Sequence, residues 1–258
     1  MSPFELLEPR SLGDAVAALQ SDGARPMSGG TAVMLMMKAG VLKPTRLVSL
    51  RRLSLEGIQV ANDKLRIGAM TSLRTLEKSD VVREGWPVIA RTLRTLSNVR
   101  VRNVATIGGH LAHGDPHMDL PPLLSALGAT VTIAGPKGER SAAVESLYRG
   151  YLETTLLPGE LITQVQVPAL GKKRAVYLKC TTRSADDWPA LGVAAVLEGD
   201  KPTIVVSAAT DKPTRLASPE AAEALHIDGD LHGSAMYKKQ LLRVFLKRAM
   251  HEARNASH

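Results

Sequence analysis

The sequence predicts an α+β chain with a larger N-terminal unit and a smaller C-terminal unit. Three features indicate this fold class: segments that alternate apolar and polar residues, segments whose apolar residues recur at helical spacing, and a polar break at Gly171–Arg174 just after Pro168. The 258 residues are 44% apolar and 22% charged, which is typical of a globular protein with a sizeable core.

Capping residues and turn signals order the N-terminal elements. Apolar spacing after Ser11 favours a helix that stops near Gly23, and Asn62–Asp63 is a typical hairpin turn. We expect, in order, a helix capped by Ser11, a strand ending at Ser28, a helix over residues 32–38, a hairpin turning at Asn62–Asp63, and helical structure over residues 71–96 broken near Ser79 and Pro87.

The second half of the chain is read in the same way. We expect a short buried helix and then a strand over residues 120–135, strands near residues 159–168, 176–181 and 203–208, a turn at Gly199–Asp200, and two helices beginning near Ser218–Pro219 and Ser234. No internal repeat interrupts this pattern.

Composition narrows the class of protein. The net charge of +8 is dispersed along the chain, which argues against a nucleic-acid footprint. No stretch is long and apolar enough to cross a membrane, and the acidic N-terminal residues do not resemble a signal peptide, so we expect a cytoplasmic protein. The single cysteine, Cys180, cannot form an intramolecular disulfide or hold an iron-sulfur cluster of its own, and we expect it to be a small buried hydrophobe.

The first candidate site is the stretch SGGTAV at residues 28–33. Paired glycines between a strand and a helix leave backbone N–H groups unblocked, so the turn can hold a diphosphate, and Thr31 adds a hydroxyl. A plain tight turn is the alternative.

The second candidate, TIGGHLAHGDPHMDLPP at residues 106–122, repeats a hydroxyl residue and a glycine pair. Two such cradles indicate an extended ligand or one with two phosphates. Histidine commonly binds metal ions, so His110, His113 and His117 also raise the possibility of a metal site. Their spacing matches no zinc helix motif, and Gly114 and Pro116 disfavour a rigid ligand-bearing helix. Histidines with no ligand role remain a third interpretation.

The third candidate is YLKCTTRSADDWP at residues 177–189. A strand would place Lys179 and Arg183 on one face, where a cation can stabilise an anion developing on a bound ring. A solvated strand edge is the alternative.

In their order along the chain, these stretches resemble the FAD-binding medium subunit of the molybdenum hydroxylases. This family includes enzymes of the carbon monoxide dehydrogenase, xanthine dehydrogenase and aldehyde dehydrogenase type. Residues 28–31 are similar to the family's A-G-G-T loop, and residues 106–122 to its T-I-G-G-N-L-A-N-A-D-P-x-x-D-L-P-P signature. TTLLPGELITQVQVP is similar to a third family segment, and residues 177–197 to the K-x-x-x-R-x-x-x-D segment with the helix that follows it.

The resemblance implies a vanillyl-alcohol-oxidase-type FAD-binding fold of two α+β subdomains, plus a small C-terminal flavoprotein domain. The implied boundaries are residues 1–171 for the FAD-binding domain, divided at about residue 56 into subdomains 1–56 and 57–171, and residues 172–258 for the C-terminal domain.

The resemblance also implies which residues hold FAD, and it implies no catalytic side chain and no metal ligand. The first and second glycine stretches would hold the diphosphate and ribityl chain, Asp119 the ribose or adenine end, Ile162 the flavin face, and Lys179 the pyrimidine edge. The implied set is Met27, Ser28, Gly29, Gly30, Thr31, Ala32, Val33, Leu96, Ser97, Thr106, Gly108, Gly109, His110, Ala112, His113, Asp119, Ile162 and Lys179.

His110 and His113 depart from the family's asparagines, and Gly114 from an alanine. Imidazole can still donate a hydrogen bond, but it is bulkier and titrates near neutrality. No covalent attachment residue is evident, so we expect non-covalent FAD.

The resemblance places the molybdenum cofactor on a large partner subunit and the iron-sulfur clusters on a small one, so we expect a heterotrimer that pairs into a dimer of heterotrimers. The alternatives are a free-standing FAD oxidoreductase of the same fold, a scaffold subunit that has lost FAD, and a nucleic-acid-binding protein.

Overall fold

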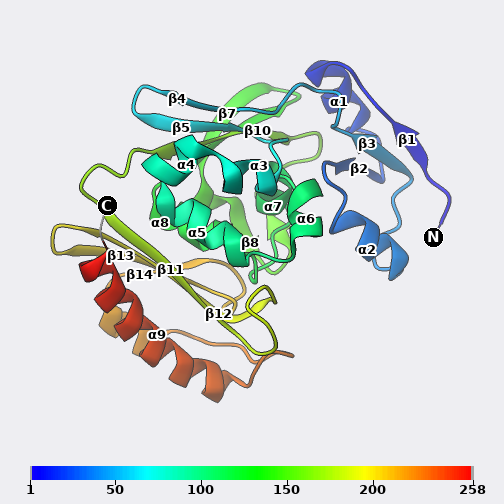
Figure 1. Ribbon diagram of the computed structural model, residues 1–258. Coiled ribbons are helices and arrows are strands. Elements are labelled where there is room, and N and C mark those ends of the chain that lie inside the picture. Colours follow the sequence, from blue (N-terminus) through cyan, green and yellow to red (C-terminus); the bar gives the residue numbers. More distant parts are fainter. Residues whose placement is uncertain (1, 257–258) are drawn as a thin grey trace.

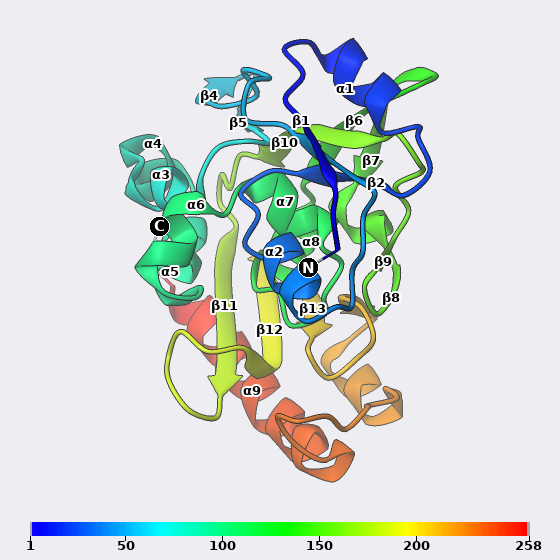
Figure 2. The ribbon, with the colours of Figure 1, turned by 90° about the vertical axis from the view of Figure 1, so that its right-hand side faces the viewer.

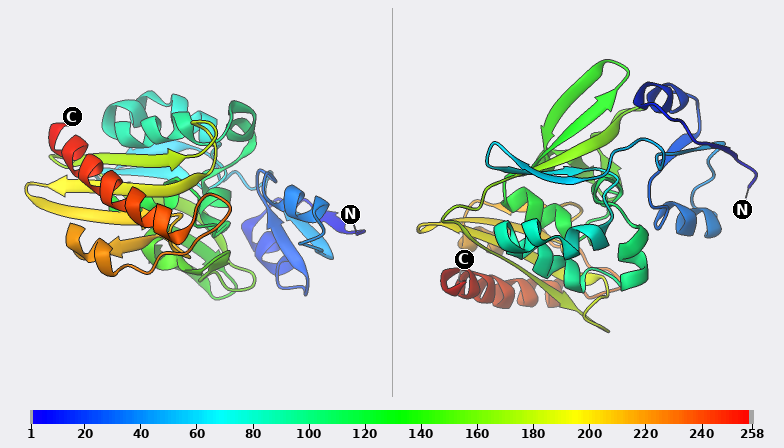
Figure 3. Two further views of the ribbon diagram at one scale, coloured as in Figure 1. Left: turned by 90° about the horizontal axis from the view of Figure 1, so that it is seen from below. Right: turned by 45° about the horizontal axis from the view of Figure 1, so that its top comes forward.

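The computed structural model describes residues 2–256, and its N-terminal elements form a small separate lobe (Figures 1 and 3). Its elements are β1 (Glu5–Leu7), α1 (Leu12–Ala18), β2 (Ala24–Met27), α2 (Val33–Lys38) and β3 (Arg46–Ser49). The three strands form a parallel sheet in the order β1-β3-β2. Ser11 Oγ accepts the N–H of Asp14 at 3.1 Å, which confirms the predicted cap of α1.

A five-stranded antiparallel sheet forms the centre of the molecule, in the order β4-β5-β10-β6-β7. Its strands are β4 (Ile58–Ala61), β5 (Lys64–Gly68), β6 (Thr130–Gly135), β7 (Gly138–Ala143) and β10 (Leu161–Pro168). The predicted hairpin joins β4 to β5, and positive φ angles of 53° at Asn62 and 55° at Asp63 define a turn of type I′.

Six short helices lie between this sheet and the C-terminal elements (Figures 1 and 2). They are α3 (Leu73–Lys78), α4 (Asp80–Gly85), α5 (Pro87–Thr95), α6 (Val99–Val104), α7 (Ile107–Ala112) and α8 (Leu120–Ala126), and a 3₁₀ turn (Val144–Leu147) and the short strands β8 (Tyr148–Gly150) and β9 (Glu153–Thr154) follow β7. The predicted breaks are confirmed, since Ser79 caps α4 and Pro87 opens α5. Trp86 Nε1 donates to the carbonyl of Pro168 at 2.8 Å and ties these helices to the end of β10.

The third sheet is antiparallel, in the order β11-β12-β13-β14, and α9 (Ala235–Asn255) crosses one of its faces (Figure 3). Its strands are β11 (Arg174–Thr181), β12 (Pro189–Glu198), β13 (Lys201–Ser207) and β14 (Thr214–Leu216). Helix α8 contacts β12 and β13, whereas α9 contacts β11 and β12. The sheet is therefore enclosed between two layers of helix.

This enclosure corrects one expectation. The resemblance implied a helix after residue 187, but Pro189–Glu198 is the strand β12, nearly all of it buried. Ala194 and Val196 belong to the central core, while Val193 and Ala195 belong to the core under α9. A strand buried on both faces loses the alternation of apolar and polar residues, so its sequence does not distinguish it from a buried helix.

Two expectations for the C-terminal segment have different outcomes. Ser234 caps α9 as predicted, with its Oγ accepting the N–H of Tyr237 at 3.2 Å. The helix expected after Ser218 is only a 3₁₀ turn over Pro219–Ala224. Cys180 is partly buried beside the core under α9. The outer limits of the predicted domains, residue 1 and residues 257–258, lie outside the described residues.

No helix within residues 2–256 combines the length and the apolar character needed to cross a bilayer.

Helix α9 should contribute to stability through its buried face. Leu242 is 1% exposed in the core under α9, so Leu242→Ala should lower the free energy of unfolding by about 2–5 kcal/mol. Val244 lies only two residues along the same helix but is 44% exposed, so Val244→Ala is the matched control and should change stability little. Urea denaturation followed by circular dichroism measures both, and equal effects would contradict this packing.

Candidate functional site

The loop between β2 and α2 presents unpaired backbone donors. Within the described residues, the amides of Gly29, Gly30, Thr31 and Ala32 meet no protein acceptor. Gly30 has a φ of +74°, a conformation that favours glycine. Successive bare amides in such a loop can hold an anionic group, which is the role expected of this glycine pair from the sequence.

The second glycine pair is built differently, and the expectation that it repeats the first loop is wrong. Thr106 caps α7, and its Oγ1 accepts the N–H of Gly109 at 3.1 Å. The amide of Gly108 donates to the carbonyl of Ala69 at 2.9 Å, and that of His110 to Thr106. These amides are already satisfied, so the second stretch supplies shape and side chains rather than free donors.

Close approach explains why glycine stands at these positions. A Cβ on Gly29 would lie 2.1 Å from the carbonyl oxygen of Val104, and one on Gly109 would lie 2.3 Å from Ser28 Oγ. A Cβ on Gly108 would lie 2.7 Å from that of Ala69. The glycines therefore let the two stretches, far apart in sequence, pack directly against each other.

A cavity of about 550 Å³ opens beside the two glycine stretches. It lies between the N-terminal lobe, the central helices and the segment that joins β11 to β12, and its size is typical of a small-molecule site. Of the residues predicted from sequence, all but Lys179 line it: Met27, Ser28, Gly29, Gly30, Thr31, Ala32, Val33, Leu96, Ser97, Thr106, Gly108, Gly109, His110, Ala112, His113, Asp119 and Ile162.

The wall formed by Leu96 and Ser97 is fixed from behind by a buried arginine. The Arg102 guanidinium donates to the carbonyls of Leu96, at 3.1 Å, and of Ser97. Its Nε donates to the Glu77 carboxylate at 2.8 Å, so the charge is compensated where it is buried. Ser97 has a φ of +52°, which this carbonyl contact holds in place.

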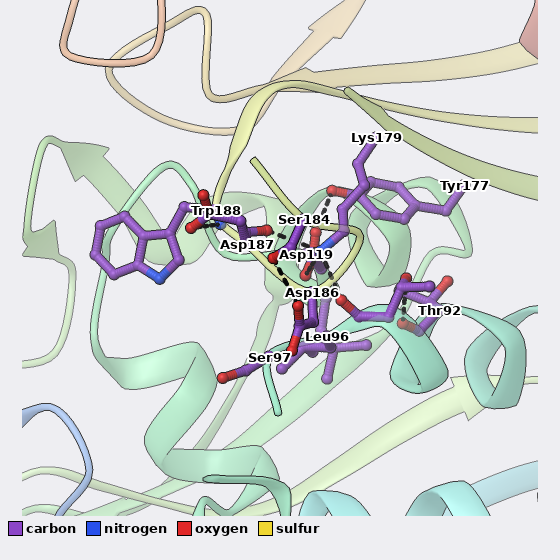
Figure 4. Close-up of polar contacts among 12 residues, drawn as sticks. Thr92, Leu96, Ser97, Asp119, Tyr177, Lys179, Ser184, Asp186, Asp187 and Trp188 are labelled. Carbon is purple, nitrogen blue, oxygen red and sulfur yellow. Dashed lines mark hydrogen bonds and ion pairs between the residues drawn. The ribbon is translucent and has the colours of Figure 1, made fainter. Parts of the chain in front are cut away.

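Asp119 is bound by two side chains of β11 (Figure 4). Tyr177 donates its hydroxyl to Oδ1 at 2.8 Å, and Lys179 Nζ lies 3.2 Å from Oδ2. Lys179 also donates to the carbonyls of Thr95, at 2.7 Å, and Asp187, at 3.1 Å. Burial raises the pKa of Asp119, while Lys179 and Tyr177 act to lower it.

These contacts change the roles inferred for Asp119 and Lys179. The resemblance assigned them to opposite ends of an extended FAD, but a 3.2 Å contact puts both at one end of the cavity. All three ammonium protons of Lys179 have protein acceptors, and its side chain is not part of the cavity wall. Lys179 therefore positions Asp119 from behind.

The spacing of Lys179 and Arg183 predicted that they share one face of a strand, and this prediction is wrong. Strand β11 ends at Thr181, and Arg183 Nε donates to the Asp187 carboxylate at 3.1 Å on the surface. The strand ends because residues 182–188 turn toward the cavity, where Asp186, Asp187 and Trp188 join its lining.

The two histidines that replace family asparagines are uncharged near neutral pH. Burial and the nearby His113 lower the pKa of His110 to about 3, and burial lowers the pKa of His113. His110 therefore does not titrate near neutrality, contrary to the sequence expectation. Its Nε2 accepts the N–H of Leu120 at 3.4 Å, which leaves Nδ1–H as a donor.

The described residues contain no cluster of side chains that would support the metal-site interpretation. Within residues 2–256, no group of three or more histidine, cysteine, aspartate or glutamate side chains is arranged to hold a metal ion. His117 instead contacts the carboxylates of Asp115 and Asp230, each at 2.8 Å.

Several cavity residues were missed from sequence. Those from outside the predicted stretches are mainly apolar side chains, many of them from the N-terminal lobe and from the loops around β9. Others, His117 and Trp188 with its neighbours, lie inside the predicted stretches but were not assigned to the site. Trp188 carried a signal, since a tryptophan within the polar run SADDWP is unusual in a chain with two tryptophans. The additional residues include Arg25, Leu35, Leu50, Met70, Val101, His117, Leu152, Leu156, Asp186, Asp187 and Trp188.

The α+β fold has a cavity between its N-terminal lobe and the rest of the chain, with a loop of unpaired glycine amides at the edge of the cavity. This arrangement is typical of a dinucleotide-binding protein. Residues 2–170 match a family model described as the FAD binding domain in molybdopterin dehydrogenase. The chain belongs to this family, that of the FAD-binding medium subunits of molybdenum hydroxylases, and is an oxidoreductase subunit. The predicted family and fold class are thereby confirmed.

Curated relatives and solved structures agree. The chain is 32% identical to the carbon monoxide dehydrogenase medium chain of Afipia carboxidovorans, with 97% of this chain and 96% of the relative covered. It is 28% identical to the glyceraldehyde dehydrogenase medium chain of Sulfolobus acidocaldarius, with 96% and 98% covered. Its structure matches the reconstituted CO dehydrogenase from Oligotropha carboxidovorans with a TM-score of 0.93, at 30% identity over 99% of both chains.

The buried ion pair yields a test of how Asp119 is positioned. Lys179→Met leaves the Asp119 carboxylate without its cation and should lower the free energy of unfolding at pH 7 by about 3–5 kcal/mol. Arg183→Met removes a surface ion pair of the same segment, whose arginine is 78% exposed, and should have no measurable effect. Urea denaturation compares the two variants. Because Asp119 can take up a proton, the Lys179→Met defect should shrink at low pH, and a defect that does not would contradict the ion pair.

Proposed function

We propose that this chain binds FAD non-covalently in the cavity and, as the medium subunit of a heterotrimer, passes electrons from an iron-sulfur subunit to an external acceptor. The observation that carries the proposal is the run of four bare amides at Gly29–Ala32, with the second glycine stretch packed against it. The FAD-binding family match and the cavity of about 550 Å³ support the same occupant.

The residues present fit a dinucleotide. The Gly29–Ala32 amides and the Thr31 hydroxyl would hold the diphosphate as fixed dipoles, without a competing protein acceptor. Asp119, which Tyr177 and Lys179 orient, would accept hydrogen bonds from hydroxyl or amino groups of the ligand. Leu96 and Ile162 would provide apolar walls.

Bound FAD would supply the redox chemistry, since it accepts and releases electrons one or two at a time. The chain's own task is then binding, orientation and exclusion of water from the carrier. His110 and His113, both neutral near pH 7, would offer hydrogen bonds without adding charge beside it.

The partner subunits follow from the same reasoning. One cysteine cannot hold an iron-sulfur cluster, which needs about four protein ligands, so the clusters would reside on a small subunit. The relatives are medium chains of dehydrogenases, which supports a large subunit carrying the molybdenum cofactor. We propose that the heterotrimers pair into a dimer of heterotrimers.

We also propose the division of the chain near residue 171 into an FAD-binding domain and a C-terminal domain. The family match over residues 2–170 supports this boundary, as does the change of sheet between Pro168 and Arg174. The FAD-binding part would itself consist of two subdomains divided at about residue 56.

The cradle is tested by FAD titration of the full chain. Gly29→Ala drives a Cβ into the backbone at Val104, so FAD affinity should fall by about tenfold or more. Gly85→Ala is the matched control, because no atom lies within 4 Å of its Cβ position, and it should bind like the parent. Thr31→Val keeps the volume and removes the hydroxyl, and it should weaken binding while leaving the unfolding midpoint unchanged. Parent-like affinity of both loop variants would contradict the cradle.

The heterotrimer is tested by isolating the chain, with an affinity tag, from its native cells. Iron, labile sulfide and molybdenum should co-purify on two further polypeptides, together with FAD absorbance in the visible spectrum. An identically tagged unrelated protein is the control. Turnover by the chain without partners would instead indicate a free-standing oxidoreductase, and a colourless chain that takes up no added FAD would indicate a scaffold.

A further inference from the structure

His117 lies between two carboxylates that come from distant parts of the chain. Its Nδ1 lies 2.8 Å from Asp115 Oδ1, and its Nε2 lies 2.8 Å from Asp230 Oδ2. The imidazole is 7% exposed. Asp115 follows α7 of the central helices, whereas Asp230 precedes α9 of the C-terminal segment. The ring therefore joins the central helices to the C-terminal segment.

This geometry requires a doubly protonated ring. A carboxylate is only an acceptor, and neutral imidazole has one donor nitrogen and one acceptor nitrogen. With a carboxylate at each nitrogen, both nitrogens must donate. Burial acts to lower the pKa of His117, but the hydrogen bonds with Asp115 and Asp230 outweigh burial and raise it.

Both carboxylates are ionised. Burial acts to raise the pKa of Asp230, but hydrogen bonds from Lys238 and His117 outweigh it and lower that pKa to about 2. The pKa of Asp115 is lowered in the same way by its two hydrogen bonds with His117. The Lys238 ammonium, 1% exposed, donates to Asp230 and to the carbonyl of Ala208, each at 2.6 Å. One buried carboxylate, Asp115, and one partly exposed carboxylate, Asp230, are thus balanced by one ammonium and one imidazolium.

Three titratable groups lie directly around His117: Asp115, Asp230 and His232, whose ring centroid lies 5.2 Å from that of His117. Lys238 contacts Asp230, and His113 and Tyr151 interact electrostatically with the same carboxylates.

One face of His117 carries the indole of Trp188. The ring centroids are 5.5 Å apart and the planes are inclined by 20°, a stacked arrangement within the range of a cation–π contact. Both rings line the cavity, and Trp188, which is 43% exposed, stands at the end of the 182–188 segment (Figure 4). The position of Trp188 in the cavity wall therefore depends on the ring beneath it.

We propose that His117 is a positioning residue: its imidazolium, clamped by Asp115 and Asp230, holds the Trp188 indole as a wall of the FAD cavity, and loss of its proton releases Trp188 and weakens FAD binding. The inference rests on the proposed function, since FAD is the ligand that the wall contacts.

The raised pKa of His117 sets the direction in which FAD affinity should change with pH. The clamp is fully formed at pH values below the ordinary imidazole pKa of 6.5. It is lost as the pH rises through the higher folded-state pKa of His117. FAD should therefore bind more weakly in alkaline solution, by about two- to fivefold, the factor that corresponds to a partly exposed cation–π contact.

The first arm of the test needs no cofactor. Trp86→Phe leaves Trp188 as the sole tryptophan of the full chain, and a stacked imidazolium quenches indole fluorescence. Emission should rise with pH at a midpoint above 6.5, and His117→Gln should abolish the transition. His226→Gln, at an exposed surface ion pair, is the control and should leave it intact. A transition that disappears in His232→Gln and survives in His117→Gln would overturn the assignment.

The second arm is FAD titration between pH 6 and pH 9. The parent should lose affinity with the same midpoint as the fluorescence change, while His117→Gln and Trp188→Ala should each bind weakly at every pH, and the double variant no more weakly than either. Trp188 is partly exposed, so Trp188→Ala guards against a variant that fails to fold. Additive effects, or FAD affinity independent of pH, would overturn the inference and leave the proposed function standing. No FAD binding at any pH would overturn both.

Discussion

The site depends on a direct approach of two backbone segments that side chains would prevent. Gly29 lies against the carbonyl of Val104, and Gly109 against Ser28, so the β2–α2 loop of the N-terminal lobe sits on the start of α7. That contact fixes where the unpaired amides point, because the loop cannot move outward without losing it or inward without a clash. The two glycine pairs thus have separate tasks. The first leaves its amides free for a ligand, while the amides of the second are paired with Ala69 and Thr106, and the absence of a side chain on Gly109 lets Ser28 approach.

The C-terminal sheet contributes to the cavity although its strands are not part of the cavity wall. Tyr177 and Lys179 reach from β11 to the Asp119 carboxylate, and the segment after β11 brings Trp188 to the wall. The sheet can do this because helices pack on both of its faces: α8 covers one face of β12 and α9 the other. This packing holds β11 in place against the central helices. A buried pair such as Asp119 and Lys179 is weak evidence for stability in itself, but it fixes one geometry, and removing either partner leaves an uncompensated charge.

Much of the fold could be predicted because its signals are local. The Ser11 cap and the Asn62–Asp63 turn depend on residues within one or two turns of chain, and the structure has both. The failures share a physical cause, which is that tertiary contacts decided the outcome. The resemblance implied a helix at β12, and the sequence could not correct it, because burial on both faces removes the alternation that marks a strand. The candidate residues were found by motif and not by periodicity, and all but Lys179 line one cavity, yet the partners that set their roles could not be read from spacing. Lys179 looks like a free cation in sequence, whereas three acceptors surround it in the structure.

The charges around the cavity are distributed so that a basic chain presents a glycine loop without charged side chains. The net charge of +8 is not concentrated here: within the described residues, Arg25 is the one lysine or arginine in the cavity lining, and its guanidinium donates to the carbonyl of Ala24. His110 and His113 are held neutral by burial, and the imidazolium of His117 is matched by carboxylates. A diphosphate would therefore meet fixed amide dipoles rather than mobile cations. Dipoles that are already oriented need no reorganisation when a ligand arrives, and they leave no unpaired charge when it departs. Such a site would hold a dinucleotide by shape and by hydrogen bonds from groups that are already in place.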